Sequence, residues 1–77
     1  MSNRLLTFEC DGQRQVVEVH ANQEGLDYLI EALSRLRDSA IPDHIHMMTP
    51  AWGGQELSET NQNVEFAHLQ HVKVCKW

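Results

Sequence analysis

The chain has little positive charge. Six lysine and arginine residues stand against eleven aspartate and glutamate residues, which gives a formal net charge of −5 over 77 residues. Nucleic acids and anionic membranes bind proteins through basic faces, so this composition disfavours both as ligands. The net charge favours encounter with a basic partner, although an ordinary solvated surface has the same composition.

Long apolar runs and paired cysteines are also lacking. No stretch approaches the ~18 consecutive apolar residues of a membrane-spanning helix, and the first residues lack the apolar segment of a signal peptide. The two cysteines are Cys10 and Cys75. Strand alternation places them on opposite faces of a sheet, so we expect free thiols in a reducing compartment. These features together predict a cytoplasmic protein.

Glycine, proline and aromatic residues are too few for a fibrous or disordered chain. The sequence has four Gly, two Pro and 6% aromatic residues, with a hydrophobic content of 42%. A chain of this length buries only ~60% of its unfolded surface when it folds. We therefore expect a single domain over residues 1–77 with a thin core.

The first half of the sequence predicts a hairpin followed by a helix. Residues 4–10 and 15–21 alternate between apolar and polar side chains, and Asp11-Gly12 between them is typical of a two-residue type I′ turn. That turn pairs Leu6 with Val17. Asn22 is a good N-cap for a helix that runs to about Arg37. We expect an apolar stripe on this helix to face the sheet: Leu26, Leu29, Ile30, Leu33 and Leu36.

The second half predicts two more strands. Residues 44–48 alternate as a strand, residues 49–63 form a long loop, and residues 65–76 form a last strand with a bulge near Gln70. The order is β-β-α-β-β. It predicts an α+β fold in which one helix packs on one face of a four-stranded, mainly antiparallel sheet.

The alternation divides the strand residues between two faces of that sheet. The helix is expected to cover Leu6, Phe8, Val17, Val19, Ile45, Met47, Val72 and Val74. The opposite face then carries Leu5, Val16, His20, His44, His46, His71, Cys75 and Trp77. Such a mixture is typical of a moderately polar protein-binding surface, and a solvated sheet face is the alternative.

Three histidines on that opposite face raise the question of a metal. His44 and His46 share one side of a strand, and His71 could supply a third ligand from the last strand. The sequence has neither a Cys-x-x-Cys nor a His-Glu-x-x-His pattern. We therefore predict no metal and no other cofactor, and keep His44, His46 and His71 as the candidate ligands, with Cys75 as an alternative to His71.

The loop after residue 48 is the second candidate surface. Gly53-Gly54 permits a positive φ or a close backbone approach, and tryptophan is enriched among recognition anchors. The alternative is that the Trp52 indole folds back over the end of the core. The sequence shows no Ser-His-Asp order, nucleophile elbow or phosphate loop, so we predict no enzyme. The candidate partner-binding residues are Thr49, Pro50, Trp52, Gly53, Gly54, Gln55, Glu56 and Glu59.

The run His-x-Met-Thr-Pro-x-Trp-Gly-Gly-x-Glu-Leu in residues 46–57 resembles the signature of the immunity protein 32 family. Residues 24–29 and 71–77 are similar to the flanking parts of that family. The resemblance implies a bacterial protein that neutralises a polymorphic toxin by binding it, without catalysis.

Two functions therefore stand side by side. The first is a protein-binding domain. Its partner is a toxin, in particular a basic toxin domain, or a second copy of the chain, or both of these. The alternative is a small metal-responsive or ligand-responsive domain that uses the histidine-bearing face.

Overall fold

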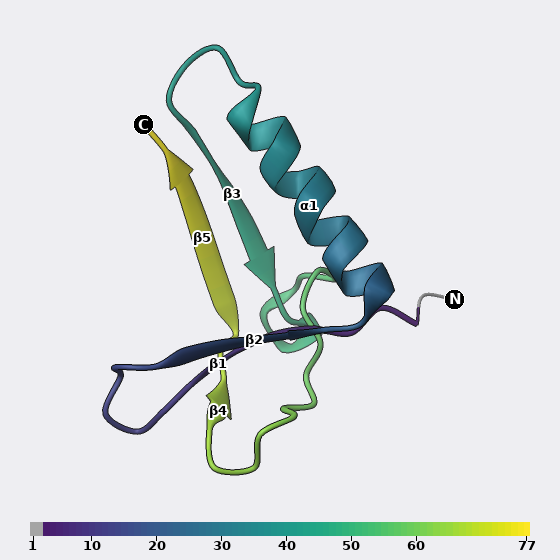
Figure 1. The fold of residues 1–77 in the computed structure, drawn as a ribbon, viewed down its shortest axis with the longest axis vertical. Helices are drawn as coiled ribbons and strands as arrows, with labels where there is room; N and C mark the ends of the chain where they lie inside the picture. The colour runs from purple at the N-terminus through teal and green to yellow at the C-terminus, as the bar shows by residue number, and fades with distance from the viewer. Residues whose placement is uncertain (1–2) are drawn as a thin grey trace.

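The strands divide between two antiparallel sheets that cross near one end of the molecule (Figure 1). The computed structural model describes residues 3–77. One sheet has the order β2-β1-β4 and the other has the order β3-β5. The elements are β1 (Leu6–Cys10), β2 (Val17–Ala21), α1 (Gln23–Arg37), β3 (Asp43–Met48), the 3-10 helix η1 (Pro50–Trp52), β4 (Ala67–His68) and β5 (His71–Lys76). The predicted α+β class is confirmed. The prediction of a single four-stranded sheet is wrong, because the strands form one sheet of three strands and one of two.

The predicted last strand divides between the two sheets at Leu69-Gln70. The Leu69 N–H donates to the Phe8 carbonyl at 2.7 Å, whereas the Gln70 carbonyl accepts from the Thr49 N–H at 3.0 Å. Residue 69 thus still pairs with β1, and residue 70 already pairs with the end of β3. The irregularity that predicts a bulge near Gln70 is the point where the chain changes sheets.

The β1-β2 hairpin has a longer loop than Asp11-Gly12 predicts. In the observed register Phe8 pairs with Val19 and Cys10 pairs with Val17. The Asp11 side chain accepts hydrogen bonds from the backbone N–H groups of Gln15 and Val16. Arg14, within the loop, has a positive φ of 59°. A side chain that bonds its own loop competes with the tight turn. The register moves by an even number of residues, so the predicted faces are kept.

α1 begins and ends where the sequence predicts. The Asn22 side-chain oxygen accepts from the N–H groups of Gly25 and Leu5, each at 2.9 Å, so the helix cap also ties α1 to the start of β1. Gly25 permits this close packing, because a Cβ there would lie 1.9 Å from the Leu5 carbonyl oxygen. The side of α1 that packs on the strands includes Gly25, Ala32 and Leu36, which are buried.

The core is small and lies where α1 meets both sheets. Leu6, Met47 and Leu57 are its buried members, and further residues pack against them: Phe8, Ala21, Tyr28, Leu29, Val72 and Val74. Val17 and Val19 share the face of Leu6 but remain 57% and 48% exposed. The prediction that the helix covers them is wrong, because α1 covers only the Ala21 end of β2. Within residues 3–77, no helix combines the length and apolar character needed to cross a membrane.

Candidate functional site

A tight turn follows β3 directly and presents Trp52. The Thr49 carbonyl accepts from the N–H groups of Trp52 at 2.9 Å and Gly54 at 3.0 Å. Thr49 itself is fully buried, and its hydroxyl donates to the side-chain oxygen of Gln70. The turn is therefore fixed at the end of β3 and also to Gln70, the residue before β5.

The two glycines of the turn meet two different requirements. Gly53 has a φ of 90°, in the left-handed region, and its N–H donates to the Pro50 carbonyl at 3.0 Å. Gly54 lies against β3, where a Cβ would be only 2.4 Å from the Met48 carbonyl oxygen. Positive φ and close approach, the two reasons that the sequence offers for Gly53-Gly54, are each confirmed at one position.

Two predicted contact residues brace the turn through their carboxylates. Glu56 accepts from the Met48 N–H at 3.1 Å and from the Gln55 N–H at 3.2 Å. Glu59 accepts from the Ala51 N–H at 2.6 Å. Their negative charges thus lie at fixed places beside η1.

Trp52 heads a row of aromatic rings on the face of β3-β5 opposite α1. Its indole is 59% exposed, so it does not fold back over the core. The His71 ring lies 6.3 Å from it, and His46 stacks on His71 with a centroid separation of 4.9 Å. His44 meets the edge of His46, also at 4.9 Å. We call Trp52, His71, His46 and His44 the aromatic row.

His46 and His71 interact directly, and the surroundings of His46 shift its pKa. Nδ1 of His46 and Nε2 of His71 are 2.7 Å apart, so one ring donates and the other accepts. Desolvation and the neighbouring charges of His44, His71 and Lys73 lower the pKa of His46 below its usual 6.5. The lowered pKa favours the neutral form of the His46 imidazole near pH 7.

The predicted candidate ligands come together, but not as a metal centre. The facing nitrogens of His46 and His71 bond each other, and His44 packs edge-on. Among residues 3–77, no group of three or more His, Cys, Asp or Glu side chains is placed to hold a metal ion. Both cysteines are free, with Cys10 partly buried and Cys75 exposed.

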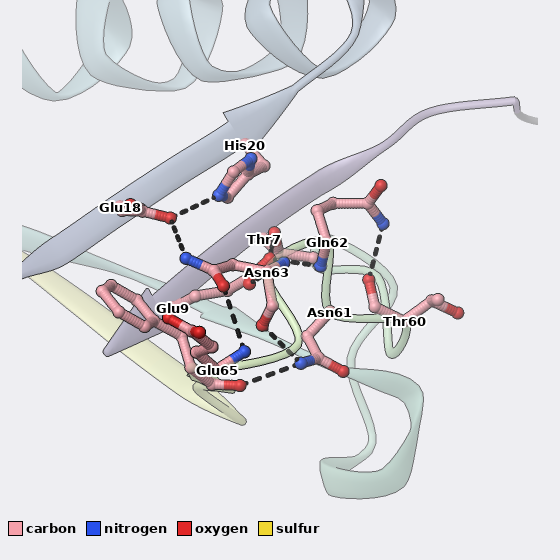
Figure 2. A network of polar contacts seen from close by, with 10 residues as sticks. Thr7, Glu9, Glu18, His20, Thr60, Asn61, Gln62, Asn63 and Glu65 are labelled. Carbon is pink, nitrogen blue, oxygen red and sulfur yellow. Dashed lines mark hydrogen bonds and ion pairs between the residues drawn. The ribbon is translucent and has the colours of Figure 1, made fainter. Parts of the chain in front are cut away.

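A buried carboxylate that the sequence analysis did not single out holds the long loop in place. Glu9 is fully buried on the outer face of β1 and accepts from the Thr7 hydroxyl at 2.6 Å and from the N–H groups of Gln62 at 2.8 Å and Asn63 at 2.9 Å (Figure 2). Burial alone would raise the pKa of Glu9, but these hydrogen bonds and His20 outweigh it and lower the pKa. One sequence signal could have pointed to Glu9. Residues 60–63 are polar and typical of a loop, and the backbone N–H groups of such a loop need hydrogen-bond acceptors.

A second carboxylate ties the same loop to β2. The Glu18 side chain accepts from the Asn63 amide at 3.1 Å and contacts His20 Nε2 at 2.9 Å (Figure 2). These two hydrogen bonds lower the pKa of Glu18. His20 therefore belongs to this loop contact and lies on the other sheet from the aromatic row.

The sequence model of one family, Immunity protein 32, matches residues 16–71. Comparisons with curated proteins and with solved structures give no significant match. The matched span covers more than two thirds of the 77 residues. It contains β2, α1, β3 and the whole Trp52 turn. The chain belongs to the immunity protein 32 family.

Proposed function

We propose that the chain neutralises a protein toxin by binding it directly, with Trp52 as the central contact and with no catalytic step. The observation that carries this proposal is a large, 59% exposed indole on a turn fixed by backbone hydrogen bonds. Tryptophan dominates many protein interfaces, and a preformed anchor loses little conformational entropy when it binds. Membership of an immunity protein family supports a toxin as the partner.

The aromatic row extends the proposed contact along β3-β5. The face that carries His44, His46 and His71 has no helix or strand packed over it among the described residues. Imidazole and indole rings offer apolar area together with hydrogen-bonding edges, a combination suited to a moderately polar interface. The contact would therefore run from the turn along the sheet.

The predicted loop residues divide into two roles. Pro50, Trp52, Gly53, Gln55 and Glu59 are exposed and are proposed to touch the partner. Thr49, Gly54 and Glu56 are buried or partly buried and hold the turn through the backbone contacts described above. These three would act on binding through the shape of the turn.

The net charge of −5 favours a basic toxin domain as the partner. Charge of opposite sign accelerates encounter, and salt screens this effect over ~10 Å at 0.1 M. For such a partner, association should slow as ionic strength rises while dissociation changes little.

The proposal predicts a neighbouring gene that encodes a toxin domain, lethal when it is expressed without this chain, and the test uses that toxin domain. Co-expression with the wild-type chain should protect cells, and Trp52→Ala should remove protection and raise the Kd for the purified toxin about 30-fold or more, as for other anchor residues. Val64→Ala is the control, because Val64 is also a large apolar residue, 93% exposed, and lies in the loop that Glu9 and Glu18 hold against the other sheet. Full protection and an unchanged Kd for Trp52→Ala would refute this site.

Self-association is a separate proposal, because different residues carry it. The aromatic row faces away from α1, and α1 has exposed apolar side chains of its own: Leu26, Ile30 and Leu33.

A further inference from the structure

β2 has one backbone edge that pairs with no other strand. The sheet order is β2-β1-β4, so β2 bonds to β1 on one side only. The Asn22 N–H donates to the Leu5 carbonyl at 3.1 Å, and hydrogen-bonded positions alternate along an antiparallel pair. By this alternation, every second residue of β2 directs its N–H and C=O groups away from β1: Val17, Val19 and Ala21.

These outward backbone groups have no hydrogen-bond partner within residues 3–77. The second edge of β1 differs, because its Leu6 and Phe8 carbonyls accept from the N–H groups of Ser58 at 2.8 Å and Leu69 at 2.7 Å. α1 begins beyond the end of β2 and rises away from the strand (Figure 1). The chain thus closes one side of this sheet and leaves the β2 side open. Another extended strand is the ligand that completes such an edge.

β2 also lacks the residues that commonly protect an open edge. Lysine and proline serve this purpose in many proteins. The sequence of β2 is Val-Glu-Val-His-Ala, and its Val17 and Val19 side chains are 57% and 48% exposed. β5, an edge strand of the other sheet, carries Lys73 and Lys76. Of these two edges, β2 is therefore the better suited to pair with a further strand.

The side chains of β2 match those of a second, antiparallel β2. Val19 is the central residue of the strand, so pairing Val19 with its own copy places Val17 opposite Ala21. The same register places Glu18 opposite His20 on the other face of the sheet, where opposite charges stabilise a cross-strand pair. A shift by two residues would put Glu18 opposite Glu18, or His20 opposite His20, and would leave one end of the strand unpaired. The match therefore selects a second copy and a single register.

Glu18 and His20 have atoms left for this contact. Oε1 of Glu18 lies 2.9 Å from Nε2 of His20 in the same chain and accepts from the Asn63 amide at 3.1 Å. Oε2 of Glu18 and Nδ1 of His20 have no hydrogen-bond partner among residues 3–77. These two atoms are available to the second copy.

The exposed apolar side of α1 offers no comparable match. Helical spacing places most of the charged side chains of α1 on the side opposite Leu26, Ile30 and Leu33. Arg37, which lies nearer to these residues, pairs with Asp38. Complementary groups that identify a partner are therefore found on the β2 edge and not on this side of α1.

We propose that two copies of this chain associate through β2, with the two strands antiparallel about a twofold axis at Val19. The outward N–H and C=O groups of each β2 then bond those of the other. The two three-stranded sheets become one continuous sheet of order β4-β1-β2-β2-β1-β4. The aromatic row belongs to β3, β5 and the Trp52 turn, so the dimer uses none of its residues.

Sedimentation equilibrium of the purified full chain tests the association. The wild-type chain should sediment with twice its mass of 8.9 kDa at about 100 µM, a concentration above the Kd of even a modest dimer. Val19→Lys should sediment at the single-chain mass, because two ammonium groups would face each other across the axis. Val64→Lys is the matched control: Val64 is 93% exposed in the loop, so the same change there should leave the dimer intact.

A mixing experiment tests the twofold axis. Val19→Glu should also be monomeric alone, but an equal mixture of the Val19→Glu and Val19→Lys chains should restore the double mass, since opposite charges then meet. Circular dichroism should show the wild-type fold in both variants, because Val19 is 48% exposed.

Amide hydrogen exchange of the wild-type chain tests the backbone pairing without any substitution, so it decides the matter even if a variant fails to fold. The Val19 N–H is unpaired in the single chain and bonded in the dimer. Its exchange, resolved by residue, should slow about tenfold or more between roughly 1 µM and 100 µM chain. The Glu18 N–H, which the alternation directs toward β1 in either state, should slow by a smaller factor and is the internal control.

Four results would overturn the proposal. A wild-type chain that stays at the single mass would exclude the dimer. A folded Val19→Lys chain that still dimerises would place the contact elsewhere, and a mixture that remains monomeric would exclude a self-facing residue 19. A dimer whose Val19 N–H exchanges as fast as in the single chain would exclude strand pairing. None of these results depends on the toxin, so the proposed function can fail or hold independently.

Discussion

The indole of Trp52 and the imidazole of His71 lie with ring centroids 6.3 Å apart and planes inclined by 39°. The pairing of Met48 with His71 at the junction of β3 and β5 brings these two segments together. The hydrogen bond from the Thr49 N–H to the Gln70 carbonyl continues this pairing into the turn. The surface that we propose for toxin binding is therefore formed by backbone pairing and needs no rearrangement before a partner arrives.

Replacing His71 by alanine should raise the pKa of His46 toward its usual 6.5. Desolvation first, and then the charges of His44, His71 and Lys73, hold that pKa down, and the variant removes one of these charges. A titration of the histidine ring protons by NMR from pH 5 to 8 measures the change. His68→Ala is the control, since His68 lies in β4 on the other sheet, and an unmoved His46 pKa in His71→Ala would show that the rings do not interact in solution.

The lowered pKa of His46 also has a consequence for stability. The unfolded chain protonates this imidazole near pH 6.5, before the folded chain does, so protons favour unfolding. The contribution of His46 to stability should be complete above that pH and decrease as the pH falls through the folded-state pKa. Urea unfolding at pH 7.5 and 5.5 should show a smaller loss for His46→Gln than for the wild-type chain.

Gly54→Ala should destabilise the fold through the turn. Its Cβ would lie 2.4 Å from the Met48 carbonyl oxygen, and backbone atoms cannot move aside as a flexible side chain can. We expect the free energy of unfolding to fall by ~1–3 kcal/mol, as for other overpacked sites. Gly12→Ala is the control, because no atom lies within 4 Å of its added Cβ. Equal urea midpoints for both variants would show that Gly54 is not closely packed.

The adjacent methionines of β3 should respond differently to truncation. Met47 is fully buried in the core, whereas Met48 is partly exposed on the opposite face. Met47→Ala should cost ~2–5 kcal/mol, which is a large share of the stability of a domain this small, and Met48→Ala should cost clearly less. Urea unfolding of the two variants measures both costs, and similar values would contradict the alternation of β3.

Local signals in the sequence predicted the elements well. The Asn22 cap fixed the start of α1, and strict alternation in residues 44–48 predicted β3. The exposure of Trp52 rules out the alternative in which its ring folds back over the core, and binding of a partner by this turn stays a prediction. Each of these features depends on residues that are near one another in the chain.

The features that failed depend on a competing side chain in the hairpin loop and, elsewhere, on partners that are distant in the chain. The hairpin register followed the Asp11-Gly12 signal, whereas the Asp11 side chain stabilises a longer loop. The change of sheet at Gln70 depends on the separate pairing of β4 with β1 and β5 with β3. Periodicity marks the apolar side of α1, but it does not say how much neighbouring surface is present to cover Leu26, Ile30 and Leu33.

Glu9→Gln should destabilise the chain most at neutral pH. The amide can accept at one position only, so one of the three hydrogen bonds from Thr7, Gln62 and Asn63 to the buried side chain is lost. We expect the free energy of unfolding to fall by ~1–3 kcal/mol at pH 7. Urea unfolding of the wild-type chain and the variant measures this loss.

The size of that loss should depend on pH in a definite direction. The folded-state pKa of Glu9 is lowered from 4.5, so as the pH falls the unfolded chain takes up the proton first. Stability from this carboxylate is therefore complete above pH 4.5 and is lost as the pH falls through the folded-state value. The difference between the wild-type chain and Glu9→Gln should therefore shrink between pH 7 and pH 3. A constant difference would mean that Glu9 contributes by packing and not by its charge.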